Sequence, residues 1–265
     1  LTIDKLILLD PAGGMPSSAR RAGSHVLINL AQETESLQEE LRKQNGPEEA
    51  SRHLRNLSLC QDCLGYLAHT ASAVITTPTI AGSGPGEQHP LIHNLLTDKP
   101  MISPSLPKLS DRTPATATTV LRLGTPVRVL RDVDLRGPAV DLPRLVALIN
   151  DSFGRKLDTE AYLERLQGTA AALIIAGDYD GAAIVTYEHT RDATRPVPYL
   201  DKFAVLRAKQ GAAGVADLLF NALIQTFPDE LLWRSRANNP VNKWYFERAK
   251  GTSSIDGTHW KLFWT

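Results

Sequence analysis

The sequence predicts an α/β protein in two parts. Residues 1–115 read as a partial α/β segment that ends in a linker, and residues 116–265 as a mixed sheet flanked by helices. Three observations support this: strand-like and helix-like patterns alternate in the first part, an ordered series of such patterns fills the second, and residues 80–114 between them are rich in Pro and Gly. At roughly 100–200 residues per domain, the length suits one large domain or two smaller ones.

Composition excludes several classes of protein. The chain has 29 Lys+Arg against 29 Asp+Glu, so bulk electrostatic binding of nucleic acid or of an anionic membrane is not expected. No apolar run approaches the roughly 20 residues that a membrane span needs. Two cysteines are too few for a disulfide scaffold and favour a reducing compartment. Because the chain opens on Leu1, we expect a fragment or processed product without its targeting peptide.

The first part alternates strands and helices. Residues 5–9 form a short apolar run that ends in a Gly-rich turn, residues 25–30 favour a second strand, and residues 73–77 are a β-branched strand. Residues 47–69 carry apolar side chains at spacings of three and four, which predicts an amphipathic helix. The acidic patch at residues 33–40 is typical of a solvated helix face. Residues 80–114 are expected to be irregular.

The second part has clearer patterns. Strands are predicted at residues 127–133, 171–176, 182–187, 199–206, 231–236 and 260–264, the second and third forming a hairpin. A helix begins after Asp141, which can cap it, and a short helix follows Lys156. Two more helices are predicted at residues 215–227 and 244–249.

A loop of small residues between a strand and a helix is the first candidate site. Small side chains let backbone N–H groups approach a ligand, and the following helix directs its positive end at the same place. The loop is Gly211-Ala212-Ala213-Gly214, followed by Val215 and Ala216. It suits a phosphate or pyrophosphate, although an ordinary tight turn has the same pattern. It lacks both the Lys-Ser/Thr ending of a nucleoside-triphosphate loop and the G-x-G-x-x-G spacing of a dinucleotide site.

A pair of arginines is the second candidate site. On a strand, residues two apart face the same side, so Arg234 and Arg236 can present two guanidinium groups to one pocket. Each guanidinium can bind a carboxylate through two parallel hydrogen bonds, which suits a dicarboxylate. The alternative is a solvated strand face.

The order of elements in the second part resembles the GNAT superfamily of acetyl-coenzyme A-dependent N-acetyltransferases. That superfamily has a loop written Q/R-x-x-G-x-G/A. Here Gly214-Val215-Ala216 matches its second half, the first position falls on Gly211, and Gln210 lies one residue early. Binding of a phosphate by the backbone N–H groups of this loop, here called the cradle, does not depend on the side chain at that position.

Three motifs resemble the fungal- and vertebrate-type N-acetylglutamate synthase family. They are Ser152-Phe153-Gly154-Arg155-Lys156-Leu157, Tyr199-Leu200-Asp201-Lys202-Phe203 and the W-R-S-R-x-x-N-P-x-N-x-W-Y-F run at 233–246. The resemblance covers residues 120–265. It extends more weakly into residues 1–110, which look like the end of that family's amino-acid-kinase-like domain.

The resemblance implies acetyl transfer from acetyl-CoA to the α-amino group of L-glutamate, by direct attack in a ternary complex, as the first step of arginine biosynthesis. Tyr245 would protonate the leaving thiolate, and Asn239 would hydrogen-bond the amino or acetyl region. The glutamate-binding residues implied are Lys156, Lys202, Arg234, Ser235, Arg236, Ala237, Asn238 and Asn239. The acetyl-CoA-binding residues implied are Phe203, Ala204, Val205, Leu206, Gly211, Ala212, Ala213, Gly214, Val215 and Ala216. Apart from the resemblance, Lys202 reads as a snorkelling side chain, Lys156 as a surface residue and Tyr245 as a core aromatic.

The resemblance also implies a mitochondrial matrix enzyme. L-Arginine would inhibit the full-length enzyme through the kinase-like domain, and we expect a homo-oligomer and a complex with N-acetylglutamate kinase. No metal is expected: Cys60 and Cys63 have the spacing of half a zinc site without a second pair, and Cys60 falls on an apolar helix stripe. Two alternatives stay open, namely an acetyltransferase for peptide or protein amines, and an amino-acid-sensing module without catalysis.

Overall fold

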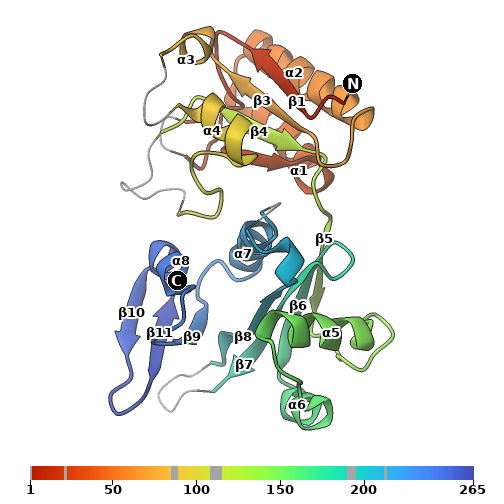
Figure 1. Ribbon diagram of the computed structural model, residues 1–265, viewed down its shortest axis with the longest axis vertical. Helices are drawn as coiled ribbons and strands as arrows, with labels where there is room; N and C mark the ends of the chain where they lie inside the picture. The colour runs from red at the N-terminus through yellow and green to blue at the C-terminus, as the bar shows by residue number, and fades with distance from the viewer. Residues whose placement is uncertain (1, 21–22, 85–88, 108–114, 190–194, 212–213) are drawn as a thin grey trace. The chain divides into compact units, whose positions relative to one another are not determined.

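The computed structural model describes residues 2–20, 23–84, 89–107, 115–189, 195–211 and 214–265. The chain divides into two compact units, Leu1–Pro126 and Val127–Thr265, which are described separately (Figure 1). The division falls later than the boundary expected near residue 115, because a strand at Thr119–Arg122 joins the first sheet. Within the described residues, no helix has the length and apolarity that crossing a membrane would require.

The first unit is a four-stranded mixed sheet between helices. In chain order its elements are β1 (Lys5–Leu9), β2 (Leu27–Asn29), α1 (Leu30–Gln44), α2 (Pro47–Gly65), β3 (Ser72–Thr76), α3 (Pro78–Ala81), α4 (Pro90–Thr97) and β4 (Thr119–Arg122). The strand order is β1-β3-β4-β2, with β1 parallel to β3, β3 antiparallel to β4, and β4 parallel to β2. The α/β alternation predicted for this part is confirmed. Its likeness to an amino-acid-kinase fold stays a prediction.

Alternation along the strands of the first unit gives each face its own core. Ala73 and Ile75 of β3 pack with the apolar stripes of α1 and α2, while Val74 between them packs with Leu91 of α4. Cys60 lies in the first of these cores, where burial raises the pKa of its thiol to about 12. The thiol is therefore unreactive at neutral pH.

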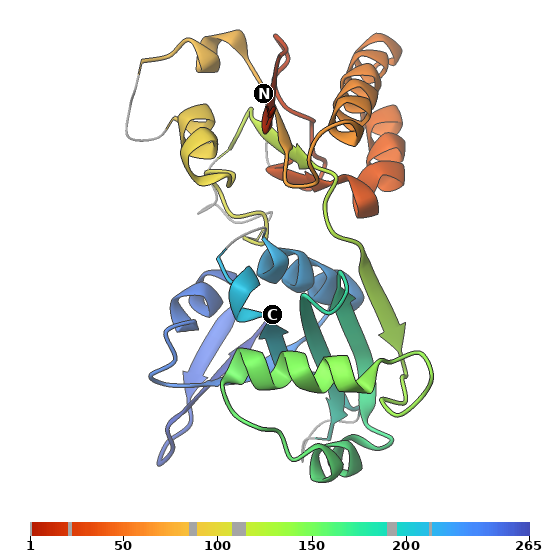
Figure 2. The ribbon, with the colours of Figure 1, turned by 45° about the vertical axis from the view of Figure 1, so that its right-hand side comes forward.

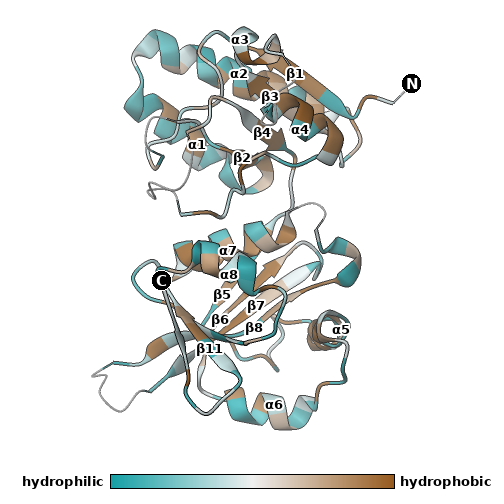
Figure 3. Cartoon of the chain, turned by 60° about the vertical axis from the view of Figure 1, so that its left-hand side comes forward, coloured by the Kyte–Doolittle hydropathy of each residue, from teal (hydrophilic) through white to brown (hydrophobic). Residues whose placement is uncertain are grey.

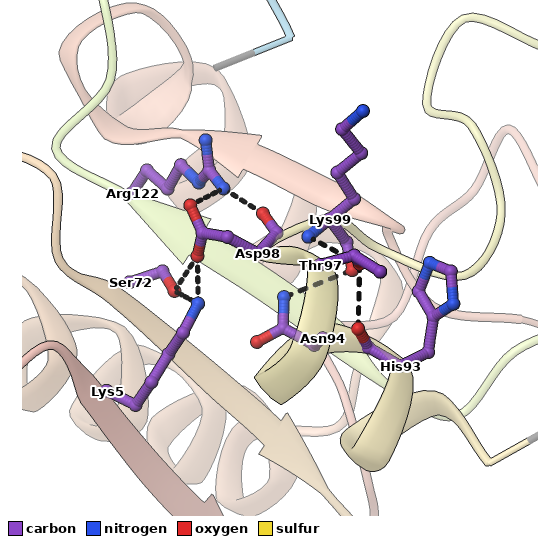
Figure 4. Close-up of polar contacts among 8 residues, drawn as sticks. All are labelled: Lys5, Ser72, His93, Asn94, Thr97, Asp98, Lys99 and Arg122. Carbon is purple, nitrogen blue, oxygen red and sulfur yellow. Dashed lines mark hydrogen bonds and ion pairs between the residues drawn. The ribbon is translucent and has the colours of Figure 1, made fainter. Parts of the chain in front are cut away.

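A polar cluster joins α4 to the sheet of the first unit (Figure 4). Asp98, the left-handed residue that ends α4, pairs with Lys5 of β1 and with Arg122 of β4, the latter at 2.5 Å. Lys5 also donates to Ser72 Oγ of β3 at 2.7 Å. The cluster thus fixes the end of the helix over the ends of three strands.

The second unit is built on a seven-stranded mixed sheet. In chain order its elements are β5 (Val127–Arg131), α5 (Leu142–Phe153), α6 (Thr159–Leu166), β6 (Ala170–Ala176), β7 (Gly181–Glu188), β8 (Val197–Val205), the 3₁₀ turn η1 (Arg207–Lys209), α7 (Val215–Thr226), β9 (Leu232–Arg236), α8 (Asn242–Arg248), β10 (Gly251–Ser254) and β11 (Trp260–Trp264). The strand order is β10-β11-β9-β8-β7-β6-β5, antiparallel except between β8 and β9. This is the succession predicted for a GNAT fold, with β10 as an addition.

Helices cover both faces of the second sheet. Leu173 and Ile175 of β6 pack toward α5 and α6, while Ala172 and Ile174 pack toward α7. Figure 2 shows α5 lying across one face, and Figure 3 shows hydrophobic colours along β6 and β7. Asp141 caps α5 as predicted, by accepting a hydrogen bond from the Arg144 N–H at 3.1 Å.

Several elements differ from the sequence predictions. Residues 80–114 were expected to be irregular, but they contain α4, whose Pro90 lies in the first turn, where proline is tolerated. Strands β4 and β10 were not predicted; β10 is a polar edge strand without alternation.

Candidate functional site

Strands β8 and β9 open apart at the centre of the second sheet. They run parallel and pair only through Tyr199 with Leu232 and Leu200 with Trp233. Strand β8 then continues to Val205, and β9 to Arg236, without further pairing between them. Backbone N–H and C=O groups normally need partners, so the edges of this opening can bind an extended ligand.

The direction of the β8 backbone groups follows from its ladder with β7. Leu206 N–H donates to the Asp180 carbonyl at 3.0 Å. Because bonding groups alternate along an antiparallel ladder, the Phe203 and Val205 groups point toward β9. The Val205 N–H donates to Ser152 Oγ at 3.2 Å, and its carbonyl accepts from Gln210 Nε2 at 3.0 Å. Residues 203–206, expected to bind acetyl-CoA, thus line one edge of the opening.

The start of α7 carries the small-residue loop. Its N-cap is Gly214, with φ +68°, and no side chain caps the helix. Gly211 also has a positive φ, +73°. Because glycine has no side chain to cap the helix, the first-turn N–H groups, including those of Val215 and Ala216, have no cap from Gly214 and lie at the positive end of the helix dipole. Ala212 and Ala213, which were expected to belong to this cradle, lie outside the described residues.

A glycine explains how α7 packs so closely on the sheet. A Cβ at Gly181, the first residue of β7, would lie 2.9 Å from Val215 and 2.7 Å from Leu219. The absence of a side chain there lets the first turns of α7 lie directly over the start of β7. This sets the loop beside the end of β8, which pairs with Gly181 through Val205.

The arginine pair lies on the opposite face from α7. Along β9, Trp233 and Ser235 are buried and Arg234 and Arg236 are exposed, which confirms that the two arginines share a face. Trp233 belongs to the core under α7, so the arginines lie on the face that carries α5 and α6. The Arg234 guanidinium lies 4.6 Å from the centre of the Trp260 ring.

The predicted lysines lie on or beside the same face. Lys202 Nζ is 4.6 Å from the centre of the Tyr162 ring of α6. Lys156 is exposed in the loop between α5 and α6. Burial raises the pKa of the Tyr199 phenol, and the charge of Arg234 opposes that shift. The structure therefore groups the cationic residues predicted to bind substrate on one side of the sheet.

The turn after β9 is organised by its own side chains. Asn239 Nδ2 donates to Ser235 Oγ at 2.8 Å, and Asn239 Oδ1 accepts from the Val241 N–H at 3.0 Å. Ala237 N–H donates to the His259 carbonyl at 2.8 Å, and Asn238 is exposed. Ser235 and Asn239 thus have a structural role in shaping the turn, and their contact with substrate stays a prediction.

Tyr245 lies in an aromatic cluster on the α7 side of the sheet. Its ring centre is 5.6 Å from that of Trp233 and 5.5 Å from those of Trp244 and Phe263. Burial raises the pKa of its phenol to about 12, so the hydroxyl keeps its proton at neutral pH. The ring of Tyr245 is therefore a core aromatic, as the sequence alone suggested. Its role as the acid that protonates the thiolate stays a prediction.

Sequence reasoning missed a buried arginine that supports Tyr245. Arg248 ends α8, and its side chain is 1% exposed. Its guanidinium donates to the Trp244 carbonyl at 2.8 Å, stacks 3.8 Å from the Trp244 ring centre, and lies 3.3 Å from Asp217 in the first turn of α7. It therefore ties the tyrosine-bearing helix to the helix that carries the glycine loop. The signal in the sequence was Asp217, which is the one charged residue of α7 and so favours a cation beside it.

The two groups of residues lie on opposite faces of the sheet that contains the opening. The cations lie on the α5 and α6 face, and Tyr245 and the α7 N-terminus on the other. No metal site is evident: within the described part of the chain, no group of three or more His, Cys, Asp or Glu residues could hold an ion.

Known proteins resemble this chain over its whole length. The mitochondrial amino-acid acetyltransferase of Schizosaccharomyces pombe is 52% identical over 268 residues, covering 99% of this chain and 52% of that protein. The mitochondrial amino-acid acetyltransferase of Yarrowia lipolytica is 42% identical over 316 residues, covering 100% of this chain and 52% of that protein. The chain thus spans about half the length of these curated relatives. A solved GNAT-family N-acetyltransferase of Escherichia coli, in complex with CoA, is 14% identical and covers 53% of this chain and 81% of its own, with a TM-score of 0.38 that is too low to support a conclusion.

A family match covers most of the second unit. The family described as NAT, N-acetyltransferase, of N-acetylglutamate synthase matches residues 129–265, which is more than half of the chain. These residues include the opening, the glycine loop, both arginines and Tyr245. The chain therefore belongs to the N-acetyltransferase family of N-acetylglutamate synthase.

Proposed function

We propose that this chain transfers the acetyl group of acetyl-CoA to the α-amino group of L-glutamate. The observation that carries the proposal is the opening between β8 and β9, which has exposed cations on one face and an uncapped helix N-terminus on the other. The names of the full-length relatives, which are amino-acid acetyltransferases, also favour it.

Acetyl-CoA fits the α7 side of the opening. Its pyrophosphate would be held by the first-turn amides after Gly214, where the N-cap has no side chain and no Cβ narrows the approach. Its extended pantetheine arm would pair with the backbone of Phe203 and Val205, in the place that a neighbouring strand would take. To do so, it would replace Ser152 Oγ as the acceptor of the Val205 N–H and Gln210 Nε2 as the donor to the Val205 carbonyl.

Glutamate fits the opposite face. Its two carboxylates need fixed cations, and Lys202, Arg234 and Arg236 share the face toward which the opening leads, with Lys156 on the loop beside it. Arginine can bind a carboxylate through two hydrogen bonds, which fixes its orientation as well as its charge. Neutral peptide amines would leave these cations without partners, which argues against the peptide-acetyltransferase alternative.

The reaction is a direct attack with no acyl-enzyme. The glutamate nitrogen, after losing a proton to water relayed by backbone carbonyls, bonds to the thioester carbonyl carbon. The carbon–sulfur bond then breaks, and Tyr245 donates its phenolic proton to the leaving thiolate. The nitrogen gives up its second proton to water, and a proton from water restores the phenol of Tyr245. Holding both substrates in one opening makes the encounter effectively unimolecular. Both cysteines lie on α2 of the first unit and take no part.

The wider role follows from the relatives. We place the enzyme in the mitochondrial matrix, as the names of those proteins suggest, at the first step of arginine biosynthesis. In the full-length enzyme, L-arginine would bind the kinase-like domain, to which residues 1–115 would contribute, and inhibit transfer. A homo-oligomer and a complex with N-acetylglutamate kinase belong to the same proposal.

Release of CoA thiol tests the proposal. The purified chain is assayed with acetyl-CoA and, in turn, glutamate, aspartate, glutamine and a peptide with a free amino terminus. We expect release with glutamate to exceed that with each of the others. Preference for the peptide would support the alternative enzyme, and binding of an amino acid without thiol release would support the sensing module. Either result would overturn the proposal.

A further inference from the structure

A β-bulge interrupts β8 at Asp201. In the ladder with β7, Ile184 lies opposite Lys202 and the next residue, Val185, lies opposite Leu200. Asp201 therefore has no residue opposite it on β7. In a regular strand, consecutive side chains point to opposite faces. Here the carboxylate of Asp201 and the ammonium of Lys202 are 2.8 Å apart, and both contact Tyr162. The bulge therefore brings two consecutive side chains to the α6 side of the sheet.

The carboxylate of Asp201 is buried, and both of its oxygens accept hydrogen bonds. Its side chain is 7% exposed and accepts from Tyr162 Oη at 2.6 Å, Arg165 Nη2 at 2.6 Å and Lys202 Nζ at 2.8 Å. Burial opposes its ionisation, but the charge of Lys202 and the three hydrogen bonds outweigh burial and keep the pKa of the carboxyl below its ordinary value. Asp201 is thus a carboxylate at neutral pH, held by two residues of one helix.

This arrangement fixes Lys202. A lysine side chain is flexible, but this ammonium lies between a fixed carboxylate and the face of the Tyr162 ring, 4.6 Å from its centre. One of its three N–H groups donates to Asp201. Among the described residues the ammonium has no other hydrogen-bond partner, so its other N–H groups can bind an anion on the face that carries Arg234 and Arg236.

We propose that Asp201, held by Tyr162 and Arg165, is a positioning residue that sets the place of the Lys202 ammonium for one carboxylate of the amino-acid substrate. This inference rests on the proposed function. Asp201 acts through Lys202 and does not touch the substrate. The bulge allows the side chains of these two consecutive residues to contact each other, whereas a regular strand would place them on opposite faces.

Steady-state kinetics of the whole chain test the proposal. Asp201→Asn keeps the shape but removes the charge, and we expect the apparent KM for glutamate to rise about tenfold with the KM for acetyl-CoA unchanged. Lys202→Met should raise the glutamate KM at least as much, and the double variant no more than Lys202→Met alone. Tyr162→Phe removes one hydrogen bond without changing charge, and should give a smaller rise in the same constant.

Two results would overturn the inference while leaving the proposed function intact. One is an unchanged glutamate KM in Asp201→Asn, and the other is a double variant in which the two effects multiply, as for independent residues. If the wild-type chain releases no thiol with glutamate, the proposed function itself has failed.

Lysine labelling tests the contact between Asp201 and Lys202 without depending on catalysis, and so separates failure of this inference from failure of the proposed function. Competitive labelling of lysine amines, read by mass spectrometry, should show Lys202 labelled several-fold faster in Asp201→Asn than in the wild-type chain. The exposed Lys156 serves as the internal reference and should not change. Equal labelling of Lys202 in the two proteins would show that Asp201 does not hold it.

Discussion

Leu200 of β8 and Trp233 of β9 form the last pair at which these parallel strands meet. The Trp233 side chain is 1% exposed and stacks on Phe263, with ring centres 5.6 Å apart and ring planes 10° apart. The same indole packs against Tyr245. The closed end of the opening is therefore fixed by an aromatic core, and the candidate acid belongs to that core.

The glycine that begins α7 should be needed for acetyl-CoA binding. Gly214 has φ +68° and open space where a Cβ would be, so Gly214→Ala should cost about 1–2 kcal/mol of stability through backbone strain alone. Relief of that strain would turn the first-turn amides away from the pyrophosphate, and we expect the KM for acetyl-CoA to rise about tenfold. Urea unfolding and initial rates measure the two effects.

Gly168→Ala is the matched control. Gly168 follows α6, has φ +76° and also has open space at its Cβ position. Its substitution should cost similar stability and leave the KM for acetyl-CoA unchanged. Equal KM effects in the two variants would mean that strain, and not the position of the amides, affects the coenzyme.

The exposed arginines of β9 should control glutamate affinity. Loss of a charge-assisted bidentate contact corresponds to about 10- to 100-fold in binding, so Arg236→Ala and Arg234→Ala should each raise the glutamate KM by that factor. The KM for acetyl-CoA should stay constant. Arg136→Ala is the control, because Arg136 is 43% exposed and pairs with the exposed Glu160. An unchanged glutamate dependence in Arg236→Ala would remove that residue from the carboxylate site.

Local patterns predicted those parts of the second unit that depend on neighbours in the chain. The period of two along β9 placed Arg234 and Arg236 on one face, and Asp141 marked the start of α5, because both signals act within a few residues. The same local signals gave a wrong prediction for the Pro-rich stretch. Its prolines favour irregular chain, but Pro90 lies in the first turn of α4, where proline is tolerated.

The opening could not be predicted in this way. Where β8 stops pairing with β9 depends on packing between residues far apart in the sequence, such as Trp233 with Phe263. The bulge at Asp201 also breaks the alternation that a strand pattern assumes, so Lys202 read as a solitary cation in an apolar strand. Its partner was the preceding residue, which a regular strand would have turned to the opposite face.

Tyr245 should be needed for turnover and not for coenzyme binding. Tyr245→Phe keeps the ring in the aromatic cluster and removes only the proton that the thiolate would take, so we expect kcat to fall about 100-fold with the KM for acetyl-CoA unchanged. Tyr187→Phe, at a side chain 36% exposed, should have no effect. Since burial raises the pKa of Tyr245 to about 12, its ionisation should not limit the rate below about pH 11. Full activity of Tyr245→Phe would exclude an essential acid there.

Glu40 should make the stability of the chain depend on pH. Its carboxylate accepts from the Ser18 N–H at 2.6 Å and lies 3.0 Å from His25 Nε2. Burial would raise its pKa, but the hydrogen bonds from His25 and Ser18 outweigh burial and lower it. A carboxyl group with a lower pKa in the folded state stabilises above its unfolded value of about 4.3 and loses that contribution as the pH falls.

Glu40→Gln should therefore lower the unfolding free energy by about 1 kcal/mol at pH 7, a value reduced by partial solvent screening, and the gap to wild type should shrink toward pH 3. Urea-unfolding midpoints at pH 7, 5 and 3.5 measure this. Glu39→Gln is the control, because Glu39 is 67% exposed and only 3.4 Å from an exposed Lys43, a pair that contributes little at any pH. A gap that stays constant from pH 7 to 3.5 would mean that Glu40 acts through its shape and not its charge.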